Sequence, residues 1–295
     1  MTPRAYLAAA TLPDGRVLAI GGWTATGPTA IVEAYSPNTN TWQTLASLAS
    51  GRNGLAAATV DGKVYAIGGS TIGVSNLVEV YDPVHNTWSH RAPLPTARAM
   101  LAAAVVDGRL YAIGGRDNMN QSLATVEVYD PATNTWRNRA PLPTARDSLA
   151  VAVEHNRRLY AIDGATNGFP RDVVEEYDPK TDTWRTLQAM PALRAGAAAV
   201  TGLDGRIYVF GGEHYALGFL ATVEAYDPRT NTWTTRANLN RDYLSGAPGV
   251  GNAFYALGGA RGNGLEFVGT VEVAQVPLPF QVYLPLVLVT RSQEG

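Results

Sequence analysis

The chain has 295 residues, of which 46% are hydrophobic and 16% charged, and its formal net charge is −2. This length suits one large domain or two ordinary ones. The near-neutral charge, without a basic stripe, argues against nucleic-acid binding. The sequence contains no cysteine, which excludes disulfides, thiolate metal sites and a cysteine nucleophile.

No segment of the chain predicts a membrane span or a secretory leader. Residues 1–10 lack a cationic stretch followed by a long apolar run. The apolar stretch 282–289 is too short to cross a bilayer. It resembles the ends of exported bacterial proteins, so export of a chain that has lost its leader stays open, and the compartment is not assigned.

Internal repetition is the strongest signal in the sequence. An arginine opens each unit, at Arg4, Arg52, Arg98, Arg146, Arg194 and Arg241. A diglycine then closes an apolar run, at Gly21-Gly22, Gly68-Gly69, Gly114-Gly115, Gly211-Gly212 and Gly258-Gly259, with Asp163-Gly164 in the remaining unit. Five units continue with a glutamate nine residues before a tryptophan, at Glu33, Glu79, Glu127, Glu175 and Glu224. The period of 46 to 49 residues is typical of a repeat architecture.

Each unit predicts four short strands, as the third unit illustrates. The segment Met100–Val106 is followed by Asp107-Gly108, a strong signal for a two-residue hairpin turn. The second strand is Arg109–Ile113, and after a variable loop the third is Thr125–Tyr129. The fourth contains Trp136. Small side chains dominate the first strand of the units, which suits the crowded axis of a propeller.

The sequence therefore predicts an all-β fold: a six-bladed β-propeller with four antiparallel strands per blade. We expect one domain over residues 1–290, followed by a tail at 291–295. The predicted blades are approximately 4–46, 52–92, 98–140, 146–188, 194–236 and 241–289.

The repeat resembles the kelch family, whose motif combines a diglycine with a spaced tyrosine and tryptophan at this period. The resemblance is carried in the third unit by Gly114-Gly115, Glu127, Tyr129 and Trp136, and extends over residues 4 to about 275. It implies a non-oxidase member of the kelch and galactose-oxidase-like propellers, because the copper oxidases of this fold need a Cys–Tyr crosslink.

The sixth unit departs from the pattern. Val271–Gln275 matches a third strand, but Ala274 stands at the tyrosine position and no tryptophan follows. We expect Phe280–Val289 to supply the outer strand, with Phe280 or Val282 in place of tryptophan. Each blade would then come from one contiguous unit. The alternative is that an upstream segment is missing and the tail is a linker.

Length variation locates the candidate recognition face. The spacing from diglycine to glutamate varies from eleven to fourteen residues, whereas the other spacings are nearly constant. Variable loops on a rigid scaffold commonly carry recognition residues. The candidates in these loops between the second and third strands are Trp23, Arg116, Asp117, Phe169, Arg171, Tyr215, Phe219 and Arg261. Such residues suit a protein, peptide or carbohydrate ligand.

The six repeated arginines allow two interpretations. Lying near the axis on the same face, they could form a ring that captures carboxylate or phosphate. Alternatively, their recurrence in every unit indicates a structural role, with each arginine bonded to backbone carbonyls of an adjacent blade. We expect the repeated glutamates to be structural hydrogen-bond partners.

We expect a monomeric binding or scaffold module rather than an enzyme, with no metal and no cofactor. The enzymatic alternative is a sugar mutarotase or epimerase that acts on an acidic sugar in the axial pocket, similar to kelch-type sialic-acid epimerases. His214, Glu213 and Asp163 would be its candidate catalytic residues. His214 has a simpler reading as a loop residue bonded to its neighbours. Asp163 can be read as a tolerated substitution stabilised by a nearby arginine.

Overall fold

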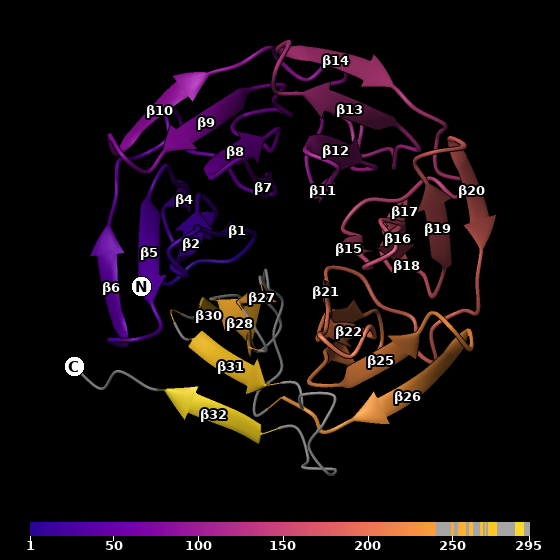
Figure 1. The fold of residues 1–295 in the computed structure, drawn as a ribbon. Helices are drawn as coiled ribbons and strands as arrows, with labels where there is room; N and C mark the ends of the chain where they lie inside the picture. The colour runs from indigo at the N-terminus through magenta and orange to yellow at the C-terminus, as the bar shows by residue number, and fades with distance from the viewer. Residues whose placement is uncertain are drawn as a thin grey trace.

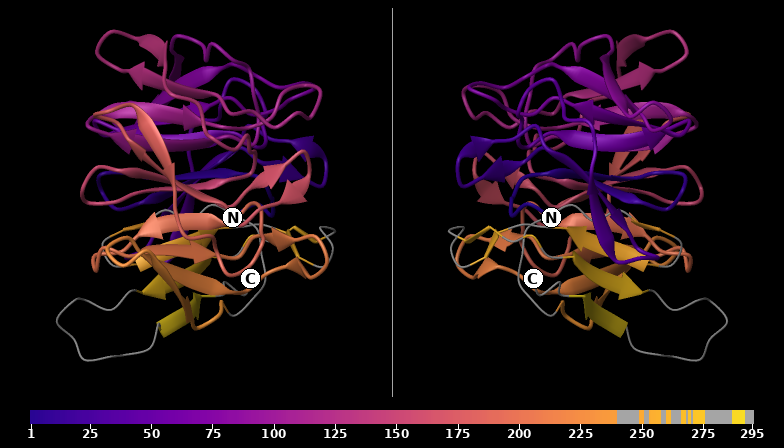
Figure 2. Two further views of the ribbon diagram at one scale, coloured as in Figure 1. Left: turned by 90° about the vertical axis from the view of Figure 1, so that its right-hand side faces the viewer. Right: turned by 90° about the vertical axis from the view of Figure 1, so that its left-hand side faces the viewer.

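Four-stranded antiparallel sheets stand radially around a central axis in the computed structural model of this chain (Figure 1). The structure describes residues 1–239, 249–250, 253–257, 260–261, 266–267, 269, 271–275 and 287–291. Edge-on, the sheets form a thick disc whose loops collect at its two faces (Figure 2). The prediction of an all-β fold with four antiparallel strands per blade is confirmed.

Consecutive strands build every blade, and the first strand of each lies nearest the axis (Figure 1). Blade 1 contains β1 (Ala8–Thr11), β2 (Val17–Ile20), β5 (Val32–Ser36) and β6 (Thr41–Thr44). Blade 2 contains β7 (Ala56–Val60), β8 (Lys63–Ile67), β9 (Val78–Asp82) and β10 (Thr87–His90). Blade 3 contains β11 (Ala102–Val106), β12 (Arg109–Ile113), β13 (Val126–Asp130) and β14 (Thr135–Asn138).

The next two blades follow the same plan, and three of the five blades also carry a small hairpin. Blade 4 contains β15 (Ala150–Val153), β16 (Leu159–Ile162), β19 (Val174–Asp178) and β20 (Thr183–Thr186). Blade 5 contains β21 (Ala198–Thr201), β22 (Ile207–Phe210), β25 (Val223–Asp227) and β26 (Thr232–Arg236). The loops between second and third strands form the hairpins β3 (Trp23–Thr24) with β4 (Gly27–Pro28), β17 (Ala165–Thr166) with β18 (Phe169–Pro170), and β23 (Glu213–His214) with β24 (Gly218–Phe219).

The prediction of a six-bladed kelch propeller is wrong in its count, because the structure has five blades with the kelch pattern. A further sheet contains β27 (Gly249–Val250), β28 (Ala253–Leu257), β31 (Val271–Gln275) and β32 (Val287–Arg291). In the five kelch blades the third-strand tyrosine pairs with the fourth-strand tryptophan, as Tyr129 does with Trp136. Here Ala274 pairs with Leu288 instead. Without that aromatic pair the segment is no kelch blade.

The tail nevertheless pairs with the last repeat-like strand. In the register of this pair, Leu288 lies opposite Ala274, where the sequence predicted Phe280 or Val282. Phe280 and Val282 lie outside the described residues. β28 and β31 contribute Tyr255, Leu257 and Val271 to a buried cluster with blade 1, so this sheet lies against the first blade, as Figure 1 also shows. The hairpin β29 (Ala260–Arg261) with β30 (Glu266–Phe267) belongs to the same region.

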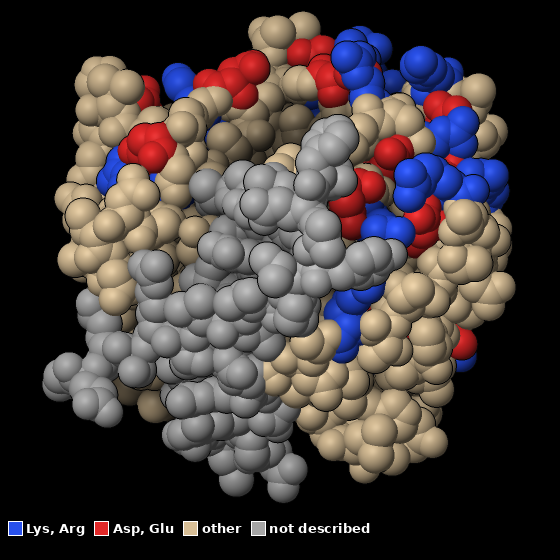
Figure 3. Space-filling view, turned by 60° about the horizontal axis from the view of Figure 1, so that its bottom comes forward, with Lys and Arg blue, Asp and Glu red and all other residues tan. Residues whose placement is uncertain are grey.

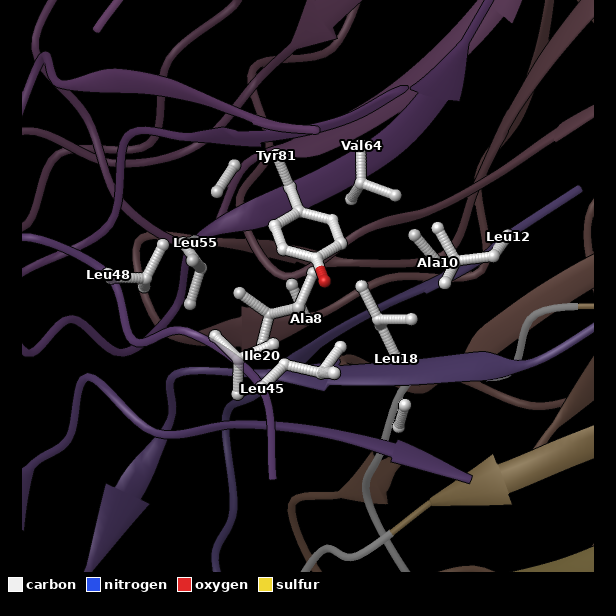
Figure 4. Packing of buried hydrophobic residues seen from close by; sticks show 13 residues of the cluster. Ala8, Ala10, Leu12, Leu18, Ile20, Leu45, Leu48, Leu55, Val64 and Tyr81 are labelled. Atoms are coloured by element: carbon white, nitrogen blue, oxygen red, sulfur yellow. The ribbon is translucent and has the colours of Figure 1, made fainter. Parts of the chain in front are cut away.

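The hydrophobic core lies in the seams between adjacent blades. In the seam of blades 1 and 2, Leu18 and Ile20 from β2 meet Leu55, Val64 and Tyr81 from the second blade (Figure 4). Each fully buried aliphatic side chain contributes about 1.5–3 kcal/mol. Stability therefore comes from the contact between sheets, since an isolated blade would expose both faces.

A repeated set of hydrogen bonds joins the outer strand of a blade to the connection that leads into that blade from the preceding one. The indole Nε1 of Trp136 donates to the carbonyl of Ala92 in the preceding connection, at 2.9 Å. Asn134 accepts bonds at Oδ1 from the Tyr129 hydroxyl and the Ala92 amide. Asn134 has φ of 54°, a left-handed conformation that asparagine tolerates better than most residues. The turn and the tryptophan together fix one blade to its neighbour.

Candidate functional site

A cavity of about 560 Å³ opens at the axis on the face that carries the small hairpins. Its described lining includes Tyr6, Trp23, Arg116, Asp147 and Glu213, which come from blades 1, 3, 4 and 5. A narrower cavity of about 270 Å³ continues along the axis between the first strands, and both share four residues: Tyr6, Met100, Ser148 and Gly196. The two cavities therefore form one funnel.

The mouth of this funnel is framed by a ring of backbone hydrogen bonds. The amides of Gly54, Met100, Ser148 and Gly196 each donate to the equivalent carbonyl of the preceding blade, at 2.8, 2.7, 2.8 and 2.6 Å. These residues and Tyr6 all have positive φ, between 52° and 67°. Left-handed backbone costs roughly 1–3 kcal/mol for a non-glycine residue, so the surrounding blades must hold this ring in place.

The arginine ring is not a ligand site in the structure, which corrects that interpretation. Arg4, Arg52, Arg98, Arg146 and Arg194 are all fully buried. Each pairs with the glutamate of its own unit, for example Arg52 with Glu79 at 2.5 Å. Arg52 also donates to the carbonyls of Gly68 and Leu77 in its own blade. Arg241 lies outside the described residues.

Burial also sets the electrostatics of these pairs. Desolvation lowers the pKa of Arg98, while the charge and hydrogen bond of Glu127 act in the opposite direction. The guanidinium has no exposed surface with which to meet a ligand. The expected structural role of the repeated glutamates agrees with this geometry. Most of the carbonyls bonded to the arginine side chains belong to the same blade rather than to an adjacent one, and the carbonyls of Thr96 and Thr144 lie in the connections that lead into the blade.

Most of the large exposed apolar side chains in the described residues lie on the face that carries the loops between second and third strands, hereafter the loop face. Trp23 is 39% exposed, Phe169 69% and Tyr215 73%. Three further exposed side chains in the same set of loops were not predicted from the sequence: Ile72, Met119 and Leu217. Their position between a second and a third strand was the available signal. Together these six residues, hereafter the apolar rim, come from all five kelch blades.

The polar loop candidates differ in their availability. Arg116 lines the cavity, and its guanidinium forms no ion pair or hydrogen bond within the described part of the chain. Asp117 instead caps its own loop, accepting from the Met119 amide at 2.8 Å and the Gln121 amide at 2.9 Å. Arg171 is exposed.

Two further candidates contribute less. Phe219 is half-buried in β24 and pairs with Glu213. Arg261 lies in β29, but its side chain is outside the description, so its role in the loop face stays a prediction.

The three candidate catalytic residues do not converge on one point. His214 accepts at Nδ1 from the amides of Ala216 and Leu217, at 3.1 and 3.3 Å, and its ring stacks on Tyr215. The imidazole is therefore a turn cap. Asp163 is fully buried and does not line the cavity. Glu213 alone faces the mouth.

The phenol of Tyr6 at the mouth is affected by the charges of two other blades, which the sequence did not predict. Desolvation raises the pKa of the Tyr6 phenol, the charge of Glu213 raises it further, and Arg116 lowers it. A carboxylate and a guanidinium from different blades thus both act on one partly exposed phenol, and the mouth carries opposite charges. On the side of the molecule drawn in Figure 3, acidic and basic side chains are interspersed.

Within the described ranges, no three His, Asp or Glu side chains are grouped so as to hold a metal ion. In the same ranges, no helix is long and apolar enough to cross a membrane.

A radial array of four-stranded blades with variable loops at one end of an axial funnel defines a β-propeller. The kelch motif matches residues 4–49, 51–95, 97–143, 148–191 and 194–240, and the chain therefore belongs to the kelch-repeat family. The five matches coincide with the five blades that contain the tyrosine–tryptophan pair.

Two known proteins illustrate the similarity. Over 71 residues, the chain is 37% identical to Kelch-like protein 41a of Danio rerio, which covers 24% of this chain and 12% of that protein. A solved structure of YjhT superposes with a TM-score of 0.85 over 98% of both chains, at 17% identity. The first similarity spans about an eighth of the relative, and the second concerns the fold alone.

Proposed function

We propose that this chain is a protein-binding module whose partner docks on the loop face, over the mouth of the axial funnel. The observation that carries the proposal is the apolar rim, in which each of five blades exposes at least one large side chain. Two of the six residues, Trp23 and Tyr215, also line the cavity of about 560 Å³. Exposed apolar clusters rimmed by polar groups are typical of interaction sites. A kelch propeller is consistent with such a module.

The composition of the rim favours a protein or peptide over a carbohydrate. Trp23, Phe169 and Tyr215 could stack on sugar rings, but Ile72, Met119 and Leu217 are aliphatic tips that gain from burying area and offer no such face. The six side chains also belong to five separate loops. A partner that reaches them must span the face, as protein interfaces of roughly 800 Å² per side do.

The charges at the mouth would orient this partner. Arg116 and Glu213 carry opposite charges and act on the same phenol of Tyr6. A partner with complementary charges would be steered into one orientation. Of the three residues named for the mutarotase alternative, only Glu213 lines the cavity, whereas His214 caps a turn and Asp163 is fully buried.

The test is selection of a displayed random peptide library on the immobilised chain, followed by titration of the selected peptides against variants. We expect W23A/Y215A to weaken binding about tenfold or more, since aromatic residues at such positions commonly contribute above 1.4 kcal/mol. The matched control is V84S/L203S, which changes two exposed apolar residues in turns outside the loop face. Equal losses in both variants, or a selection with no rim-dependent peptide, would overturn the proposal.

A further inference from the structure

The seam between blades 4 and 5 differs from the others at one glycine position. Asp163 stands where the five other units have the first glycine, and it keeps the left-handed backbone, with φ of 55°. A Cβ added at Gly21, Gly68 or Gly114 would lie 2.4 to 2.6 Å from the arginine carbonyl of the next blade. It would also approach the leucine Cδ2 of that blade to 3.0 or 3.1 Å. An ordinary seam therefore has no room for a side chain here.

The neighbouring blade compensates for the extra side chain. The leucine that closes the other seams is Leu55, Leu101 or Leu149, and the equivalent residue facing Asp163 is Ala197. The amide of Gly164 reaches the carbonyl of Arg194 at 3.2 Å, whereas the same bond in the three preceding seams measures 2.7 to 3.0 Å. The larger residue in one blade is thus matched by a smaller one and a slightly longer contact in the next.

Only one of the two carboxyl oxygens of Asp163 accepts a hydrogen bond in this space. Its Oδ1 accepts from the Ala150 amide at 2.9 Å, while its fully buried Oδ2 has no hydrogen-bond partner within the described residues. The Ala197 amide also faces the carboxyl. A buried carboxylate oxygen without a partner disfavours the ionised form.

The two cations that face Asp163 are already paired. Arg146 and Arg194, from blades 4 and 5, each donate to their own glutamate at 2.6 Å. Since Glu175 and Glu224 balance these charges, ionised Asp163 adds a net negative charge to the seam. Desolvation dominates and raises the pKa of Asp163 to about 7, against the smaller lowering effects of the amides and arginines.

We propose that the seam between blades 4 and 5 is a pH-sensitive joint, closed while the Asp163 carboxyl is neutral and weakened when it ionises. The residues at this joint also border the funnel. Ala165 follows Asp163 and Gly164, and Ala195 and Gly196 precede Ala197, and all three line the mouth. Ionisation of Asp163 would therefore act on the geometry of the loop face.

The direction of the pH effect on stability follows from the linkage between proton binding and folding. The pKa of Asp163 in the folded chain is about 7, above its ordinary value of 3.8, so the folded state holds the proton more tightly than the opened state. The stabilising effect is complete at acid pH and is lost as the pH rises towards 7. Between the two pKa values, the opening equilibrium constant should increase about tenfold per pH unit.

The experiment combines thermal melting at pH 5 to 8 with native-state hydrogen exchange of β21, corrected for intrinsic exchange rates. In the unmodified chain we expect the melting temperature to fall and β21 to lose protection as the pH rises. The equivalent strand β11 serves as the internal reference. Asp163→Asn should flatten both responses, and D163G/A197L, which restores the residues of the other seams, should do the same if the asparagine variant folds poorly.

Asp182→Asn is the matched control. Desolvation is the largest single effect on Asp182 and raises its pKa, but the hydrogen bonds from Tyr177 and Ala140 and the charge of Arg139 together lower the pKa below its ordinary value. That variant should keep the pH response between pH 5 and 8. The proposal is overturned if both Asp163 variants keep the slope of the unmodified chain, or if β11 and β21 lose protection in parallel.

Discussion

The buried arginine–glutamate pairs predict a large and specific loss of stability when one partner is neutralised. In blade 3, Arg98 is fully buried and Glu127 is 1% exposed, and they form an ion pair. Glu127→Gln removes the charge that compensates the guanidinium. Breaking a buried pair in this way costs roughly 3–5 kcal/mol. At about 2–4 °C per kcal/mol for a chain of roughly this size, the melting temperature should fall by about 6–20 °C.

Two comparisons make this prediction specific, both measured by thermal melting monitored by circular dichroism. Arg109→Ala breaks the exposed pair of Arg109 and Asp130 in the same blade, where the charged atoms are 3.6 Å apart, and should cost less than about 1 kcal/mol. The double variant R98M/E127L should recover at least part of the loss, because it leaves no buried charge. The prediction is contradicted if Glu127→Gln melts within about 2 °C of the unmodified chain, or if the double variant is the least stable.

Three smaller predictions follow from the same structure. Gly114→Ala should cost several kcal/mol in urea unfolding, because its Cβ would lie 2.4 Å from a carbonyl, whereas Gly108→Ala meets open space and should cost only about 1 kcal/mol. Trp136→Phe loses the indole hydrogen bond across the seam and should lower stability by about 0.5–1.5 kcal/mol in the same assay. Glu213→Gln should lower the pKa of the Tyr6 phenol, measured by tyrosinate absorbance, and an unchanged titration would contradict the assigned field at the mouth.

Local patterns in the sequence were sufficient for much of the blade plan. The Asp107-Gly108 turn was predicted from its residue types, and both residues have the positive φ that such a turn needs. Val106 pairs with Arg109 across it. The strand ends shifted by one or two residues, since β11 begins at Ala102 rather than Met100. Hairpin turns are decided by neighbours in sequence, which is why they could be predicted.

The recognition face was predicted only in outline. Loop-length variation indicated the correct set of loops, and Trp23, Phe169 and Tyr215 are exposed there. It could not show that Asp117 caps its own loop, or that His214 caps a turn. Those roles depend on how a short loop folds back on itself, which residue type and spacing leave undetermined.

By itself the amino-acid sequence determined the repeat, the four-stranded unit and the kelch family, because these rest on local periodicity and turn chemistry. Tertiary structure decided which charged side chains are accessible to a ligand. It buried Arg98 against Glu127 and left Arg116 at the mouth of the funnel, although both are arginines near the axis. It also paired Leu288 with Ala274, a register that no spacing rule predicted. The physical reason is that burial and strand pairing across long sequence separations depend on how the blades pack together.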